Sequence, residues 1–283
     1  MIVKKSQKFF NRDSNTIKSF GDEWTRYDQS NLTFEDSLRY FNEYFNIFPW
    51  HQINQNSVGF DMGCGTGRWA KHMAPKVGLL NCIEPSEAID IANKNLNDFK
   101  NISLIKGDVN NHNLDNESQD FGYSLGVLHH IPNTERAIES CVNLLKPGAP
   151  FLMYIYYFFE DKPLWYKYLW IFSNIFRKII SKMPRRLKYF SSDFIALTIY
   201  LPMAKLSKFL EKKSFSVDKI PLSYYRNSSF YTMRTDALDR FGTPLEKRFT
   251  KKEIRDMCIR SGLVDICFSE SQPYWCCVGY KKR

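Results

Sequence analysis

The residues best placed to do chemistry lie in a glycine-rich turn. Residues 58–62 form a short apolar run, and Gly63, Gly65 and Gly67 follow it in alternation before a helix-like stretch at 68–73. The apolar run predicts a buried parallel strand. Glycines accept backbone angles that other residues avoid and let a ligand approach the main chain. The amides at the start of the following helix would point at that ligand. The pattern therefore predicts a ligand-binding turn.

The spacing of this turn separates it from the common phosphate-binding loops. It reads G-x-G-x-G, not the G-x-G-x-x-G of dinucleotide folds, and no G-K-[ST] follows. Asp61 lies two positions before the first glycine. A carboxylate at the mouth of the turn would repel phosphate and suit a cationic ligand, such as an amino group or a sulfonium. The turn thus disfavours a nicotinamide-dependent oxidoreductase.

A second acidic residue, Glu84, ends the apolar run 77–84 and lies 17 residues after Gly67. One helix and one strand fit in that interval, the separation at which a doubly wound fold returns a carboxylate to a bound ribose. The alternative is a solvated strand end. The offset favours a ribose-binding role.

Two adjacent histidines, His129 and His130, follow the expected fourth strand, which begins at residue 121. Doubly wound folds bind their ligands at the carboxyl ends of the strands. Histidine titrates near neutrality and can act as a general base. We expect His130 to face the pocket as the catalytic base, whereas His129 is favoured for a structural hydrogen bond that holds the loop.

The motif at 61–67, D-x-G-C-G-T-G, resembles the first motif of class I S-adenosylmethionine-dependent methyltransferases. The segments V-L-H-H-I-P at 127–132 and K-P-G at 146–148 resemble a small-molecule subgroup that includes ubiquinone-type and sterol-type enzymes. The resemblance covers residues 55–156 strongly and 249–280 weakly. It implies an α/β, Rossmann-like seven-stranded sheet with helices on both faces, and S-adenosyl-L-methionine as the cofactor.

The resemblance also assigns residues to roles. Asp108, after the expected third strand, would accept hydrogen bonds from the adenine amine. The expected cofactor-binding set is Asp61, Gly63, Cys64, Gly65, Thr66, Gly67, Glu84, Pro85, Asp108, Val109, Leu125 and Gly126. Among the acceptor-site residues, Trp24 and Tyr27 would belong to a cover that closes over the cofactor, with a helix docked on the core as the alternative. The segment 236–250 resembles the return segment of this subgroup and would bring Asp239 and Arg248 back over the pocket, with Tyr225 lining it, and a solvated loop is the alternative. No metal site is expected.

Four segments organise the chain. We expect an N-terminal helical cover at 1–50, the cofactor-binding core at 51–157, and a helical, basic, aromatic-rich insertion at 158–248 that acts as a substrate lid. Residues 249–283 would return the chain to the core as a helix and the last two strands.

The insertion carries the excess charge. Twelve basic and two acidic residues lie between 162 and 213, which accounts for the formal net charge of +10. On a helical wheel, Trp165, Leu169, Phe172, Phe176 and Ile179 share one face, while polar residues including Arg177 take the other. A second apolar stretch, 189–203, is expected to stop at Pro202. Three interpretations remain: a lid packed on the core, a lid that also rests on an anionic membrane and admits a lipid-linked acceptor, or a nucleic-acid contact, which is the least favoured.

Composition bounds the remaining possibilities. Seven scattered cysteines fit buried free thiols in a reducing compartment and not a disulfide framework. The first eight residues lack a signal-peptide core, so we expect a cytoplasmic protein, with peripheral contact at the inner membrane surface as an extension. The expected activity is methyl transfer to a small or lipid-linked acceptor. A non-catalytic S-adenosylmethionine-binding protein and an RNA methyltransferase are the alternatives, and the atom that accepts the methyl group is not specified by the sequence.

Overall fold

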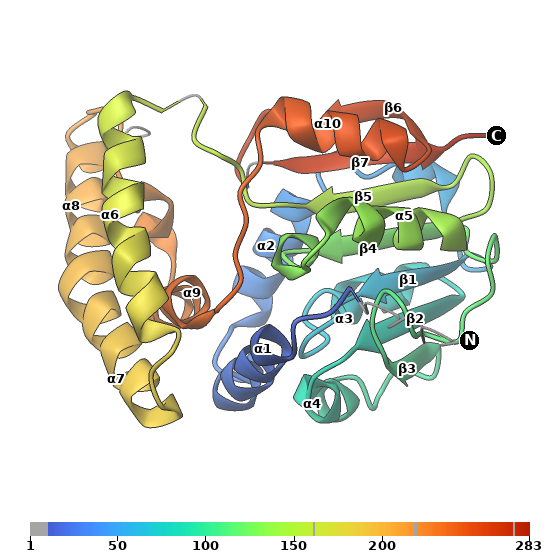
Figure 1. The fold of residues 1–283 in the computed structure, drawn as a ribbon, viewed down its shortest axis with the longest axis horizontal. Helices are drawn as coiled ribbons and strands as arrows, with labels where there is room; N and C mark the ends of the chain where they lie inside the picture. The colour runs from blue at the N-terminus through green and yellow to red at the C-terminus, as the bar shows by residue number, and fades with distance from the viewer. Residues whose placement is uncertain (1–10, 161, 218–219, 274) are drawn as a thin grey trace, which may run out of the picture.

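A seven-stranded sheet forms the centre of the molecule (Figure 1), in a computed structural model that describes residues 11–160, 162–217, 220–273 and 275–283. Its order is β3-β2-β1-β4-β5-β7-β6, with β7 antiparallel to its neighbours β5 and β6. This confirms the predicted seven-stranded α/β fold. The strands are β1 (Val58–Met62), β2 (Leu79–Glu84), β3 (Ile102–Lys106), β4 (Phe121–Leu125), β5 (Pro150–Tyr154), β6 (Leu263–Phe268) and β7 (Cys276–Lys281). The first ten residues, on which the expectation of no export signal rests, lie outside the described part.

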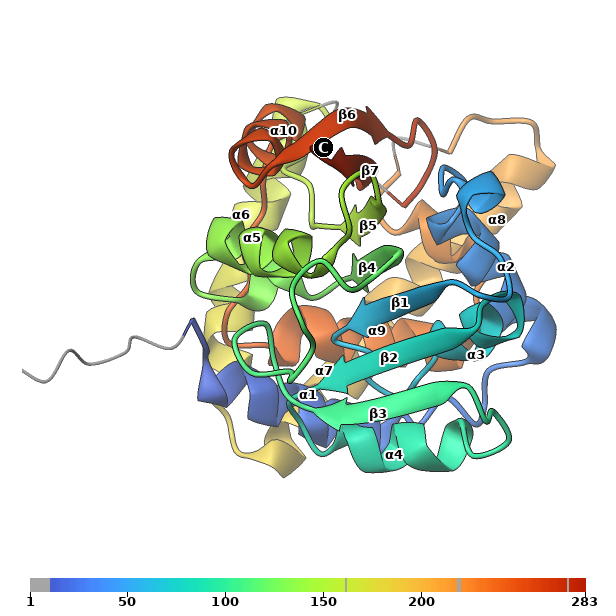
Figure 2. The same ribbon diagram turned by 90° about the vertical axis from the view of Figure 1, so that its right-hand side faces the viewer.

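Helices cover both faces of this sheet, because its central strands are apolar on both sides. One hydrophobic cluster joins the sheet to α5 (Thr134–Leu144) and α10 (Lys251–Arg260). A second joins it to α2 (Phe34–Tyr44), α3 (Ala70–Met73) and α4 (Ala88–Asn95). Figure 2 shows the two layers on either side of the strands.

Local signals in the sequence set several of these helix starts. Thr33 accepts a hydrogen bond from the amide of Asp36 and caps α2. Thr250 and Glu253 form a reciprocal capping box at the start of α10. All seven cysteines are free thiols, and Cys267 is the exposed one.

The strand register brings the predicted site to one edge. Met62 pairs with Ile83 in the parallel β1–β2 ladder, so Gly63 and Glu84 leave the sheet side by side. Helix α1 (Ser14–Arg26) packs against α4 and against α9 (Phe230–Gly242), a helix of the insertion. The carboxyl edge of the sheet therefore faces α1 on one side and the insertion on the other.

The insertion is helical, with α6 (Leu164–Ile180), α7 (Arg185–Ile195) and α8 (Leu201–Lys212) before α9. The expected stop at Pro202 is wrong. A π-helical turn at Ala196–Tyr200 carries the chain from α7 directly into α8, and Pro202 lies in the first turn of α8. The helix is continuous here, because Tyr200 and Leu201 keep αR dihedrals. The π turn just before Pro202 interrupts the regular hydrogen-bond ladder, which makes a residue without an amide easier to accommodate at that point.

The prediction for the face of α6 is wrong in part. Arg177, assigned to the polar face, is buried and donates to the carbonyls of Thr243 and Pro244 at 2.9 Å each. The apolar face lines a cavity, yet Phe172 is 60% exposed. Arg177 is drawn inward because the loop after α9 presents carbonyls that need donors. None of the helices in the described ranges is long and apolar enough to cross a bilayer.

Candidate active site

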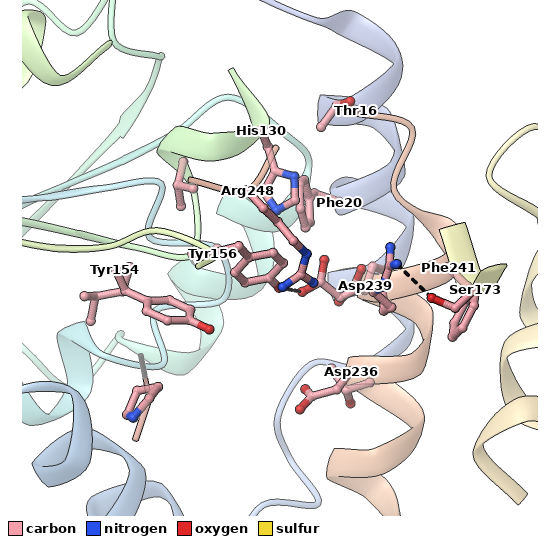
Figure 3. A pocket seen from close by; sticks show the side chains of 18 of the residues that line it. Thr16, Phe20, His130, Tyr154, Tyr156, Ser173, Asp236, Asp239, Phe241 and Arg248 are labelled. Atoms are coloured by element: carbon pink, nitrogen blue, oxygen red, sulfur yellow. Dashed lines mark hydrogen bonds between the residues drawn. The ribbon is translucent and has the colours of Figure 1, made fainter. Parts of the chain in front are cut away.

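A single large cavity joins the sheet edge to the insertion. Its volume is about 1280 Å³, and its walls come from the ends of β1, β2, β4 and β5, from α1, and from the helices of the insertion. Figure 3 shows the middle of this cavity, where His130 lies beside Phe20 of α1 and Tyr156 lies beside Asp239 of α9. Strand ends and insertion thus build one site together.

The glycine turn adopts the backbone that the sequence predicted. Gly63, Gly65 and Gly67 have φ values of 81°, 55° and 80°, a region that other residues avoid. The indole nitrogen of Trp24 lies 3.4 Å from the position that a Cβ on residue 65 would take. The turn therefore lines the cavity, and the Trp24 indole lies directly next to Gly65.

Glu84 ties this turn to the end of β2. Its Oε2 accepts from the amide of Gly65 at 3.0 Å, and its Oε1 accepts from the amide and hydroxyl of Ser86 at 2.9 and 2.5 Å. Glu84 lines the cavity although it is nearly buried. Burial raises the pKa of Glu84, against the opposing effect of the hydrogen bonds from Ser86 and Gly65.

Ten of the twelve expected cofactor residues line the cavity, namely Gly63, Cys64, Gly65, Thr66, Glu84, Pro85, Asp108, Val109, Leu125 and Gly126. Asp108 accepts from the amide of Asn110 at 2.9 Å and lies 3.8 Å from the guanidinium of Arg12. Gly67 does not line the cavity. A Cβ at this position would meet the side chain of Leu96, at the end of α4, at 2.5 Å. This glycine permits close helix packing.

Asp61 does not lie at the mouth of the turn, contrary to the prediction. It is 1% exposed, and neither carboxylate oxygen has a hydrogen-bond partner among the described residues. Burial, with the nearby charge of Glu84, raises the pKa of Asp61 to about 8. Asp61 is the fourth residue of β1, and every residue from 59 to 62 of this strand is buried, so its side chain is enclosed by the protein and not exposed to solvent.

The two histidines differ as expected in position. His130 lines the cavity, and its Nδ1 lies 2.6 Å from the carbonyl oxygen of Leu245. A carbonyl can only accept, so Nδ1 is the donor in this contact, and in the neutral ring Nε2 is the nitrogen with the free lone pair. Nε2 is buried and has no hydrogen-bond partner within the described ranges. His130 therefore presents a basic nitrogen.

His129 is held by stacking and not by the expected side-chain hydrogen bond. Its ring lies 3.9 Å from that of Tyr156, and neither ring nitrogen finds a partner in the described chain. Burial, together with His130 and Arg248, keeps the pKa of His129 well below its usual value. His129 thus lies behind Tyr156 as a neutral packing residue.

Tyr156 and Asp239 form the central polar contact of the cavity. The Tyr156 hydroxyl donates to Oδ2 of Asp239 at 2.5 Å. Burial raises the pKa of Asp239, whereas the nearby His130 lowers it. Arg248 lies 5.0 Å from the Tyr156 ring centre. The return segment brings Asp239 and Arg248 to the cavity, as expected.

Arg248 is neutralised locally by Glu246. The carboxylate of Glu246 bonds Arg248 at 3.0 Å and Arg240 at 3.2 Å. Burial alone would raise the pKa of Glu246, but the two guanidinium groups outweigh it and the pKa is lowered. This triad stabilises the segment between α9 and α10 beside the cavity.

Two further carboxyl groups in the cavity were missed from the sequence. Glu23 of α1 is 1% exposed and has one unpartnered oxygen within the described structure. Burial, then Asp239 and Asp236, raises its pKa well above the usual value. Burial raises the pKa of Asp236 to about 6. Glu23 adjoins Trp24 in sequence, so the predicted cover helix held the signal, but helical periodicity alone did not show which side faced inward.

Of the expected acceptor-site residues, Trp24, Tyr225 and Arg248 line the cavity. Tyr27 instead packs against Tyr231 and donates to Asp193 of α7 at 3.1 Å. Burial raises its pKa to about 12. Tyr27 thus fastens α1 to the insertion.

Comparison with known proteins shows which protein family the sheet region resembles. Residues 60–153 match the family model described as a methyltransferase domain. The match covers the sheet region, and that region is similar to class I, S-adenosylmethionine-dependent methyltransferase domains. The predicted family and cofactor are therefore confirmed at the level of the family.

Curated relatives of this methyltransferase domain are similar over the core alone. A sterol 24-C-methyltransferase of Debaryomyces hansenii is 32% identical over 111 residues, 36% of this chain and 29% of the relative. A ubiquinone biosynthesis O-methyltransferase of Coxiella burnetii is 29% identical over 91 residues, 31% of this chain and 39% of the relative. The chain thus spans well under half the length of either relative.

Solved structures share the methyltransferase fold over nearly the whole chain. An S-adenosylmethionine-dependent methyltransferase from Aquifex aeolicus superposes with a TM-score of 0.51 at 12% identity, covering 92% of this chain and 96% of that one. A Haloferax volcanii methyltransferase solved with a methyltransferase activator gives 0.52 at 13% identity, covering 93% and 98%. These similarities concern the fold.

Proposed function

We propose that this protein transfers a methyl group from S-adenosylmethionine to a small-molecule or lipid-linked acceptor. The observation that carries the proposal is the shared cavity of about 1280 Å³, which runs from the glycine turn into the apolar insertion. Pockets for one small ligand usually measure roughly 300–1,000 Å³. The volume and the change from polar to apolar lining fit a donor and an acceptor bound together.

The donor end fits an adenosyl group. Gly63 and Gly65 leave the main chain bare, and Glu84 and Asp108 bring carboxylates to the same rim. Carboxylates accept hydrogen bonds from ribose hydroxyls and from an exocyclic amine. Trp24 covers the turn. When bound, the cofactor supplies an electrophilic methyl group on a sulfonium.

The acceptor end supplies a base and a water-poor wall. A hydroxyl or ammonium acceptor must lose a proton as its new bond to the methyl group forms. We assign this proton to Nε2 of His130, because Nδ1 is committed to Leu245. Tyr156, fixed by Asp239, would orient the acceptor beside it. The remaining rate acceleration would come from holding donor and acceptor in the reactive orientation and from excluding water.

The same proposal includes the setting of the enzyme. We place it in the cytoplasm, with peripheral contact between residues 162–213 and the inner membrane surface when the acceptor is lipid-linked. A non-catalytic cofactor-binding protein and an RNA methyltransferase remain the alternatives, and they differ in what the next experiment measures.

The test is calorimetry with S-adenosylhomocysteine, followed by an assay of its release with candidate hydroxylated and amine-bearing lipids. His130→Ala should keep the calorimetric affinity and lower kcat by about 10²-fold or more, the usual worth of a general base. His51→Ala, on an exposed residue of a short 3₁₀ turn, is the control. Unchanged turnover in His130→Ala would remove this base. Cofactor binding without turnover on any acceptor supports the binding protein, and turnover on RNA alone supports the RNA enzyme.

A further inference from the structure

Helix α6 is apolar around most of its circumference, yet little of the protein covers it. Nine of its large apolar side chains are between 45% and 71% exposed, and only Arg177 and Ile180 are buried. A helix that is hydrophobic all round is normally buried in a large core or in a membrane. Helices α7 and α8 add Phe190, Phe194 and Phe209, which are at least 57% exposed. This exceeds the scattered apolar residues of an ordinary surface.

The apolar residues of α6 divide into two rows. An inward row, with Phe172, Phe176 and Ile179, lines the cavity. An outward row, with Tyr168, Ile171 and Ile175, is exposed and lies outside the cavity lining. The helix therefore has one apolar side for the cavity and another for something beyond the protein.

The inward row faces a matching row across the cavity. Phe190 and Phe194 of α7 and Ile199 of the π-helical turn line it as well, and each remains at least 49% exposed. The walls are thus an open apolar groove that is continuous with the donor site. In Figure 1, α6 and α8 stand on the side of the molecule away from the sheet.

The charge beside these rows is positive and unbalanced. Lys178, Lys182, Lys205 and Lys208 are exposed and form no ion pair with any described residue. The two acids of the segment are already engaged elsewhere. Asp193 pairs with Arg26 and Arg234, and Glu211 pairs with Arg226. A second copy of this chain would bring the same positive charge to the interface and be repelled.

We infer that α6, α7 and α8 rest on an anionic lipid bilayer, with the outward row of α6 in the interface and the groove open to a hydrocarbon chain of a membrane-resident acceptor. This inference deepens the proposed function, because it names the acceptor as an amphiphile. Lysines flanking Trp, Phe and Ile side chains are the pattern of helices that lie in the plane of a membrane surface. Helix α6, of 17 residues, is about 26 Å long, too short to span one comfortably.

The test is co-sedimentation with vesicles of phosphatidylglycerol and phosphatidylcholine in equal parts, against vesicles of phosphatidylcholine alone. The protein should bind the anionic vesicles and bind them more weakly at 0.5 M than at about 0.05 M salt, because lysine contacts are screened. The double variant Ile171→Ser/Ile175→Ser should lose about tenfold or more in partition coefficient. Its matched control is Ile259→Ser/Val264→Ser, on exposed residues of α10 and β6.

Two measurements separate the competing outcomes. Lipids with brominated acyl chains should quench tryptophan fluorescence, and Trp165→Phe, on exposed α6, should remove part of that quenching. Binding equal in both double variants, or none at low salt, would overturn the inference. So would sedimentation equilibrium that shows self-association abolished by Ile171→Ser/Ile175→Ser. Calorimetry with S-adenosylhomocysteine without vesicles tests the proposed function separately, because no residue of the outward row lines the cavity.

Discussion

Strand β4 and helix α6 show the two ways in which this chain places its apolar residues. Every residue of β4 is buried between two helical layers, and Phe121 is 0% exposed. Helix α6 has more apolar side chains, and most of them are exposed to solvent. The sheet completes its own core, whereas the insertion leaves apolar surface in contact with water, at an unfavourable free energy that a partner would remove. The difference teaches that the two regions contribute differently to stability.

The largest expected effect follows directly from that comparison. Phe121→Ala should lower the free energy of unfolding by about 3–5 kcal/mol, since it leaves a cavity in a closed core. Phe172→Ala, on exposed α6, should change it by no more than about 0.5 kcal/mol. Urea unfolding monitored by circular dichroism measures both. A loss of several kcal/mol in Phe172→Ala would mean that the insertion is packed as tightly as the sheet.

A smaller effect, on the affinity for S-adenosylhomocysteine, should distinguish a residue of the donor site from a nearby surface residue. Glu84→Gln should weaken S-adenosylhomocysteine binding by about 10- to 100-fold, because it removes a charge that the Gly65 amide and Ser86 contact. Glu87→Gln, three residues later and on the surface, is the control. Calorimetry gives both affinities. Vesicle binding should be the same in the two variants. A difference in vesicle binding would mean that the donor site on the sheet and the membrane-facing surface of the insertion are coupled.

The smallest effect concerns the one buried acid inside β1. The pKa of Asp61 is about 8 in the folded chain, against about 3.9 for an unperturbed aspartate in an unfolded chain. Between these values the folded chain therefore holds a proton that the unfolded chain has released. Stability should therefore fall as pH rises from about 4 to 8. Asp61→Asn has no group that titrates at this position. Its free energy of unfolding relative to that of the parent should therefore rise by about 1 kcal/mol per pH unit in this window. Thermal unfolding at pH 6 and pH 7 measures the slope, and parallel curves would contradict the assignment.

Much of the sheet region was predictable, since its signals are local. Gly63 and Gly65 have positive φ, and Thr33 and Thr250, residues of a type that often precedes a helix, cap α2 and α10. Asp61 was misplaced because the sequence shows that an acid precedes a turn, but not whether its side chain points outward. That direction depends on how the strand pairs with its neighbours.

The insertion was less predictable for a different reason. A helix with apolar residues on every side gives the wheel no basis for choosing a buried face, and only the carbonyls of Thr243 and Pro244 explain why Arg177 turns inward. Pro202 was read as a stop, although a π turn directly before it lets the helix continue. Tyr156, Glu23 and Asp236 come from three distant segments, so their meeting in the cavity is a tertiary result.

The chain leaves the sheet and returns to it at one place. Tyr157 and Phe249 form a parallel bridge, and the amide of Phe249 donates to the carbonyl of Tyr156 at 3.0 Å. Some ninety residues are thus spliced between two neighbouring backbone positions. Exchange of that whole segment would need no change in the pairing of any strand, so the cavity wall that it supplies can be altered while the sheet and its glycine turn stay the same.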